Sequence, residues 1–211
     1  MLCHHEAMAH LILASSSPRR REILSSIGLE FEIVDPDVDE SLWDGLPVEE
    51  RVMRLAEDKA LSAARRLGPG RRHACLGADT LVRVRGNDGG PGRVLGKPKD
   101  RADAKEMMLA LEGRTHDVHT GLALVGADGS VETIRSDSRV TFAPMRAEEI
   151  EGYLDSDDWE GVAGAYKIQG QAALFIERIE GSWSGIVGLP IHELYVILSH
   201  AGIGMAAQAP G

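Results

Sequence analysis

Residues 11–28, LILASSSPRRREILSSIG, place an apolar strand, a serine-rich turn and a helix directly after one another. Pro18 is favoured at the first position of a helix, where its missing amide hydrogen is not needed. Ser17 is expected to cap this helix with its hydroxyl, and Gly28 is expected to end it. A strand that leads into a helix is the unit from which parallel and mixed α/β sheets are built. The buried face of this helix is predicted to carry Ile23, Leu24 and Ile27.

The first turn of the same helix carries Arg19, Arg20 and Arg21. The amide end of a helix is partially positive, so each cation there is unfavourable by roughly 0.3 kcal/mol or more. The arrangement is explained if an anion such as a phosphate binds between the arginines and the helix end. A solvated basic turn without a ligand is the alternative.

The chain has 211 residues, 43% of them hydrophobic and only 4% aromatic, which is enough for one domain with an aliphatic core. We expect residues 10–202 to form this domain, and residues 1–9 and 203–211 to be tails. The net charge of −10 argues against a nucleic-acid partner, because binding to nucleic acid depends on neutralising phosphates. An acidic protein with locally concentrated arginines suits a small anionic ligand better than a polymer.

The two cysteines, Cys3 and Cys75, form no disulfide framework and no metal-binding spacing, so we expect a reducing, cytoplasmic location. No apolar run approaches the ~20 residues that span a bilayer, so no membrane partner is expected. The first ten residues lack the pattern of a signal peptide. His4, His5 and His10 are expected in a flexible tail rather than in a metal site, with Met8 as an alternative start.

Strand-like and helix-like segments alternate along the chain, which favours an α/β fold with one continuous sheet flanked by helices. A glycine-rich turn at 85–93 is expected to be a hairpin tip, and the turn ADGS to join two strands. Besides the first unit, strands are predicted at 31–35, 75–84, 118–125, 131–142 and 172–179, and helices at 47–67, 100–112, 148–154 and 190–200.

Asp79 lies in the otherwise apolar run CLGADTLV. A lone buried carboxylate is unfavourable unless it is paired, so such a residue is a candidate to bind a divalent cation or to accept a proton from water. A structural aspartate that caps a neighbouring loop is the alternative. Thr80, next to it, either hydrogen-bonds a ligand or satisfies the backbone.

Lys59 falls on the core side of the predicted helix 47–67, where it either points into a cleft or extends to the helix edge. Lys97 in LGKPK is a second candidate cation for phosphates, and Glu40 a second carboxylate for a metal. The amide of Gln169 could read the edge of a base, unless it is an ordinary surface residue. His116, His119 and His192 lack metal-ligand spacing and are expected at the surface or an interface.

Basic groups, buried carboxylates and an amide together indicate hydrolysis of a nucleotide phosphate. The chain has no phosphate-binding P-loop motif, no kinase motif set and no serine or cysteine in a nucleophile elbow. Direct attack by an activated water is therefore simpler than a covalent intermediate.

The chain resembles the Maf family of nucleoside triphosphate pyrophosphatases over nearly its whole length. The resemblance rests on LASSSPRRREIL, VDES, RLAEDKA, GADTLV, VLGKPKD, AGAYKIQGQAALFIERIEG and IVGLP, in this order. It implies an extended mixed sheet flanked by helices, with two lobes around a cleft, as in inosine-triphosphate pyrophosphatases. It also implies cleavage of a nucleoside triphosphate to the monophosphate and pyrophosphate, a divalent cation (Mg²⁺ or Mn²⁺) and a homodimer.

By this resemblance Asp79 is the proton acceptor, and AGAYKIQG indicates the subgroup that acts on dTTP and UTP. Arg20, Thr80 and Gln169 match positions tied to substrate choice, and Ser15, Arg19, Glu40, Lys59 and Lys97 match the polar lining of the cleft. Two other hypotheses remain open at this point. One is a regulatory binding protein of cell division with little or no catalysis, and the other is an enzyme that removes modified pyrimidine triphosphates.

Overall fold

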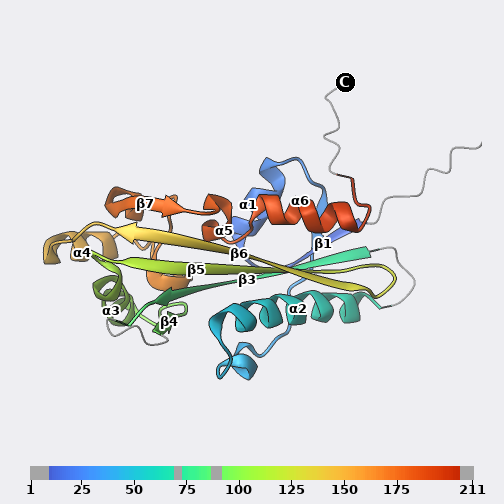
Figure 1. Ribbon diagram of the computed structural model, residues 1–211, viewed down its shortest axis with the longest axis horizontal. Helices are drawn as coiled ribbons and strands as arrows, with labels where there is room; N and C mark the ends of the chain where they lie inside the picture. Colours follow the sequence, from blue (N-terminus) through green and yellow to red (C-terminus); the bar gives the residue numbers. More distant parts are fainter. Residues whose placement is uncertain (1–9, 69–72, 87–91, 205–211) are drawn as a thin grey trace, which may run out of the picture.

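The computed structural model describes residues 10–68, 73–86 and 92–204. Within them the chain forms a seven-stranded mixed sheet with helices on both sides (Figure 1). The order is β2-β1-β3-β5-β6-β7, with β4 paired to β3; β2, β1 and β3 are parallel and the other pairs are antiparallel. The strands are β1 (His10–Ala14), β2 (Phe31–Ile33), β3 (His73–Val84), β4 (Arg93–Leu95), β5 (Thr115–Val125), β6 (Val131–Phe142) and β7 (Ile176–Glu180).

The longest helix, α2, covers one face of the sheet, and α1, α5 and α6 lie on the opposite side (Figure 1). Glycines allow α2 to approach closely, since a Cβ on Gly77 would lie 2.1 Å from the Ala56 carbonyl oxygen and one on Gly121 would lie 2.5 Å from that of Val52. The helices are α1 (Pro18–Ser26), α2 (Val48–Leu67), α3 (Arg101–Leu111), α4 (Ala147–Leu154), α5 (Trp183–Val187) and α6 (Ile191–His200). Short 3₁₀ turns are η1 (Glu40–Trp43), η2 (Ala163–Ala165) and η3 (Gln171–Phe175).

Two strands share one edge of β3 and leave a gap between them. β1 pairs with residues 73–77 of β3, and β4 pairs with Val82–Val84 on the same side. Residues 78–81 therefore have no strand partner on that edge within the described part of the chain. The gap divides the molecule into two lobes, with β1 and β2 on one side of it and β4, α3 and α4 on the other (Figure 1).

Most of the predicted elements are confirmed, including α1 from Pro18 and α2 ending before Gly68, whose φ is 71°. The four residues predicted on one face of α3, namely Ala104, Met107, Met108 and Leu111, are all buried. No helix in the described residues is long and apolar enough to cross a bilayer. Cys75 is a buried free thiol.

The predicted strand at 172–179 is wrong in its first half. Residues Gln171–Phe175 form η3, because the Ala173 amide bonds the Gly170 carbonyl and the Gln171 amide bonds the Asp158 carboxylate. These local bonds outweigh the strand preference of an apolar run. Helix α5 was not predicted, since five residues are too few to show a helical period.

Three further expectations need correction. Ser17 occupies the N-cap position of α1, but its side chain makes no capping bond; its amide instead donates to Ser15 Oγ. His116 and His119 are buried rather than at the surface, because the long strand β5 runs through the centre of the sheet; His192 is exposed as expected. Ile203, the first residue of the expected C-terminal tail, is buried in the core. Cys3, His4, His5, Met8 and most of the 85–93 turn lie outside the described residues.

Candidate active site

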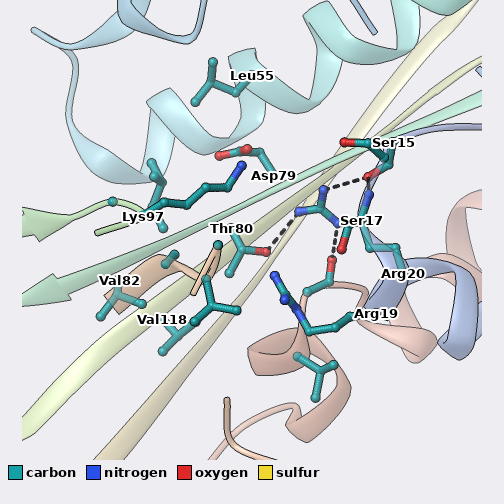
Figure 2. A pocket seen from close by; sticks show the side chains of 18 of the residues that line it. Ser15, Ser17, Arg19, Arg20, Leu55, Asp79, Thr80, Val82, Lys97 and Val118 are labelled. Carbon is teal, nitrogen blue, oxygen red and sulfur yellow. Dashed lines mark hydrogen bonds between the residues drawn. The ribbon is translucent and has the colours of Figure 1, made fainter. Parts of the chain in front are cut away.

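A cleft of about 380 Å³ lies along the unpaired edge of β3, between the two lobes (Figure 2). Nine residues that the sequence nominated line it, although they come from six separate segments of the chain. They are Ser15, Arg19, Arg20, Glu40, Lys59, Asp79, Thr80, Lys97 and Gln169. Arg21 is exposed and is not among the lining residues, so only two of the three arginines of α1 contribute.

Two carboxylates, Asp79 and Glu40, lie on one side of the cleft and are bridged by the ammonium of Lys59. The ammonium of Lys59 lies 2.7 Å from Asp79 Oδ1 and 2.6 Å from Glu40 Oε1. Lys59 and Asp79 are 7% and 6% exposed, so the lysine points into the cleft and does not extend to the helix edge. Partial burial of Glu40 is the largest single influence and opposes its ionisation, but Lys59, with Lys97 and Arg20, outweighs it and lowers the pKa of Glu40 below its usual value.

The second oxygen of Asp79, Oδ2, is buried and has no hydrogen-bond partner within the described residues. A buried polar atom without a partner costs about 1–3 kcal/mol, so such an atom calls for a ligand. No group of three or more His, Cys, Asp or Glu side chains in the described parts of the chain could hold a metal alone. Asp79 and Glu40 fit Mg²⁺ or Mn²⁺, which commonly use one or two carboxylates and take their remaining ligands from phosphates and water.

Arg20 forms the basic side of the cleft and is held in a fixed orientation (Figure 2). It donates from Nε to the Gly188 carbonyl at 2.9 Å, from Nη1 to Ser15 Oγ at 3.1 Å and from Nη2 to Thr80 Oγ1 at 3.4 Å. Arginine has five N–H donors, so two remain for a ligand. Burial lowers the pKa of Arg20 from its usual value, yet a guanidinium remains charged.

The hydroxyl groups of Thr80 and Thr120 form a hydrogen-bonded chain that orients Arg20. Thr120 Oγ1 donates to the Gly185 carbonyl at 2.7 Å, so its oxygen must accept the proton of Thr80, 3.0 Å away. Thr80 Oγ1 is then oriented to accept from Arg20. This hydrogen-bonded chain joins β3, β5 and α5 and fixes the guanidinium relative to the open edge of β3.

Arg19, Lys97 and Gln169 complete the lining. Arg19 is on the first turn of α1, where burial lowers the pKa of its guanidinium, and Lys97 follows β4 on the opposite lobe. Gln169 is exposed, follows η2 and borders the cleft. Cations from both lobes thus face one cavity that also contains a pair of carboxylates.

Comparison with known proteins agrees with this geometry. The family model described as "Maf-like protein" matches residues 10–201. The chain belongs to the Maf family. Its relatives include a protein of Hahella chejuensis named "dTTP/UTP pyrophosphatase", 46% identical over 193 residues, with 92% of each chain covered. A protein of the same name from Geotalea uraniireducens is 45% identical over 198 residues, covering 93% of this chain and 97% of its own.

The fold of this Maf protein is shared with more distant proteins. The Ham1 protein of Staphylococcus aureus superposes with a TM-score of 0.51 at 17% identity, over 90% of this chain and 98% of that one. A HAM1 protein of Coxiella burnetii gives the same score and identity, over 92% of this chain and all of that one. These likenesses agree with the predicted mixed sheet flanked by helices.

Sequence reasoning assigned no role to Thr120, Gly185 or Gly188, which support the cleft without carrying its charge. Thr120 lies opposite Thr80 in the β3–β5 register. The two glycines act through their carbonyl oxygens, which every residue type has. The strand register would have revealed Thr120, but nothing in the residue types identifies a backbone acceptor.

Proposed function

We propose that this Maf protein hydrolyses dTTP and UTP to the nucleoside monophosphate and pyrophosphate. The observation that carries the proposal is Asp79, buried with an unpartnered Oδ2 on the open edge of β3 and facing cations from two lobes. Relatives over 40% identical bear the name dTTP/UTP pyrophosphatase, which supports this substrate class. The same chemistry would act on modified pyrimidine triphosphates, because these differ from dTTP and UTP by one small substituent.

In this mechanism Arg19, Arg20 and Lys97 bind the triphosphate. Lys59 holds Asp79 through Oδ1, which leaves Oδ2 to accept a proton from the water that attacks the α-phosphorus. Negative charge then grows on the bridging oxygen and the departing pyrophosphate, close to cations that are already in place. Such preorganised charge is usually the largest single contribution to catalysis.

A divalent cation, Mg²⁺ or Mn²⁺, is part of the proposal, and Asp79 and Glu40 are the side chains that would hold it. When bound together with phosphate oxygens, it would neutralise charge on the triphosphate. Lys59, which bridges the same two carboxylates, sets how they are spaced.

The test is pyrophosphate release from a panel of nucleoside triphosphates that includes dTTP, UTP, 5-methyl-UTP, pseudouridine triphosphate and 7-methyl-GTP. Each is assayed with Mg²⁺, with Mn²⁺ and with EDTA. Asp79→Asn is the test variant. Asp117→Asn is the matched control, since Asp117 is also a buried aspartate of the sheet but does not line the cleft.

We expect release from dTTP, UTP and close analogues, dependence on the cation, and a loss of about 10²–10⁴-fold in kcat for Asp79→Asn alone. Full activity of a folded Asp79→Asn variant would refute the role of Asp79. A folded wild-type protein that releases pyrophosphate from no nucleotide would refute the proposed function and favour a regulatory binding protein instead.

We further propose that the protein acts in the cytoplasm as a homodimer without a nucleic-acid partner. The buried free thiol at Cys75 supports the location, and the net charge of −10 supports the absence of a nucleic-acid partner. The dimer rests on the resemblance to Maf proteins alone. Sedimentation equilibrium tests the dimer, and a salt-dependent mobility shift of DNA would contradict the last point.

A further inference from the structure

The loop 162–170 borders the cleft and carries Gln169, and its backbone is strained near its first residues. Gly164 has a φ of 71° and Ala165 a φ of 58°, and Ala165 is fully buried. A side chain rarely adopts this left-handed conformation, and such residues persist only where their surroundings hold them. The contacts of this loop must therefore supply the restraint.

Two contacts hold the strained turn itself. The Gly164 amide donates to the Gly96 carbonyl at 3.0 Å, next to Lys97, and a Cβ on Gly164 would lie 3.0 Å from Val82. The Tyr153 hydroxyl donates to the Ala165 carbonyl at 3.0 Å. These contacts fix the start of the loop, and the Tyr153 hydroxyl also accepts from the Lys167 backbone amide. Asp158 holds the far end through Lys167 and the Gln171 amide. Neither group bonds the Tyr166 side chain, so its position depends on another contact.

The side chain of Tyr166 contacts His116 of β5 through a hydrogen bond and a ring–ring contact. His116 Nε2 and the Tyr166 hydroxyl are 2.8 Å apart, and the two rings meet edge to face with centroids 5.4 Å apart. Phe142 packs against both rings. Tyr166 lines the cleft, whereas His116, with no exposed surface, does not.

His116 forms this bond through Nε2, while its other ring nitrogen, Nδ1, is buried without a partner in the described residues. Burial lowers the pKa of His116 to about 4, so the ring is neutral at neutral pH. A phenylalanine would pack against Phe142 without leaving a nitrogen unsatisfied. The imidazole is therefore better explained by its bond to Tyr166 than by packing.

We propose that His116 is a positioning residue for base recognition: it fixes Tyr166 and thereby holds the loop that presents Gln169 to the base. The inference rests on the proposed function, because it assigns His116 to substrate choice within that same cleft. It predicts that losing the bond weakens discrimination between bases more than it weakens cleavage, because Asp79 and the phosphate-binding cations do not touch His116.

The test compares variants that remove or restore the one bond. His116→Phe keeps a ring between Phe142 and Tyr166 but removes the bond, and Tyr166→Phe removes it from the other side. His116→Gln has an amide that can donate or accept, so it is the rescue variant. His119→Phe is the matched control, since His119 is a buried histidine of β5 that bonds Asp137 and does not touch the loop.

The first readout is the ratio of kcat/KM for UTP to that for CTP. We expect this ratio to fall at least about fivefold in His116→Phe and Tyr166→Phe, through KM, and to be retained in His116→Gln and His119→Phe. The double variant His116→Phe/Tyr166→Phe is expected to lose no more than either single variant, since both remove the same bond. An unchanged ratio in a folded Tyr166→Phe variant overturns the inference, even if His116→Phe fails to fold.

The second readout is amide hydrogen exchange of residues 163–170 without nucleotide, which does not depend on activity. We expect faster exchange in His116→Phe and Tyr166→Phe, and wild-type exchange in His116→Gln and His119→Phe. Unchanged exchange in Tyr166→Phe overturns the positioning role. If the wild-type protein hydrolyses no nucleotide, the proposed function fails, while this exchange measurement still decides whether His116 positions the loop.

Discussion

The stability of the protein is expected to depend on pH through Asp117, a buried aspartate on the α2 side of the sheet. Asp117 is 3% exposed and accepts hydrogen bonds from Arg83 at 2.9 Å and from Arg85 at 2.8 Å. Arg83 is held in turn by Glu49 of α2, 2.7 Å away. Burial opposes ionisation of Asp117, but the two guanidinium groups outweigh it and lower its pKa to about 2.

The size of the effect follows from this pKa. The carboxyl has a usual pKa of 3.8 and a folded pKa of about 2. At 1.36 kcal/mol per pKa unit, this difference is worth about 2.4 kcal/mol of stability. A lowered folded pKa means that the contribution is fully present well above pH 4, falls as the pH drops below the unfolded pKa, and has disappeared below pH 2. Roughly 1 kcal/mol of it is lost between pH 7 and pH 3.

The assay is urea unfolding of the wild-type protein and of Asp117→Asn from pH 7 to pH 3. The other carboxylates titrate in both proteins, so the difference in unfolding free energy isolates Asp117. We expect this difference to shrink by roughly 1 kcal/mol over the range. A difference that is the same at every pH would refute the reasoning. Pyrophosphate release at pH 7 should be unaffected in the folded variant, because Asp117 does not line the cleft.

Three further outcomes are expected. Thr120→Val leaves the buried Gly185 carbonyl unpaired and should destabilise the protein by about 1–3 kcal/mol in urea unfolding while raising KM, since Thr80 loses its orientation. Gly164→Ala forces a side chain onto a backbone φ of 71° and against Val82, so its unfolding free energy should fall by about 1 kcal/mol or more; an unchanged midpoint would contradict the strain argument. Added KCl should raise KM for UTP, because exposed Lys97 takes part in phosphate binding; a KM that is constant from 50 to ~500 mM salt would argue against it.

The sequence was sufficient to nominate much of the charged lining of the cleft because several candidates are exceptions to local preferences, although Glu40 and Lys97 are not. Asp79 interrupts an apolar strand, Lys59 lies on the buried face of α2, and the arginines of α1 oppose the helix dipole. Such exceptions are unfavourable unless a ligand or a partner compensates them, so they are visible in one sequence. The same reasoning overestimated Arg21, which follows the pattern but faces solvent.

What the sequence could not show depends on contacts between distant segments. The bond between His116 and Tyr166 spans 50 positions, and a histidine in a strand gives no sign of its partner. The backbone acceptor Gly188 likewise has no residue-type signature. The start of β7 was misplaced because the capping carboxylate, Asp158, precedes η3 by 13 positions and overrides the local strand preference.

The open edge of β3 explains how the cleft keeps opposite charges close without neutralising them. Asp79 and Thr80 are consecutive and so point to opposite faces of the sheet, yet both border the cleft, because β3 has no strand partner between β1 and β4. Lys59 binds Asp79 on one face, and Arg20 binds Thr80 on the other. A direct ion pair between Arg20 and Asp79 would occupy the donors needed for phosphate and the oxygen needed for water. Because Arg20 is bonded to Ser15, Thr80 and Gly188 and Asp79 to Lys59, within the described residues Arg20 retains two donors and Asp79 an unpartnered Oδ2, the combination that the proposed hydrolysis of a phosphate anhydride uses.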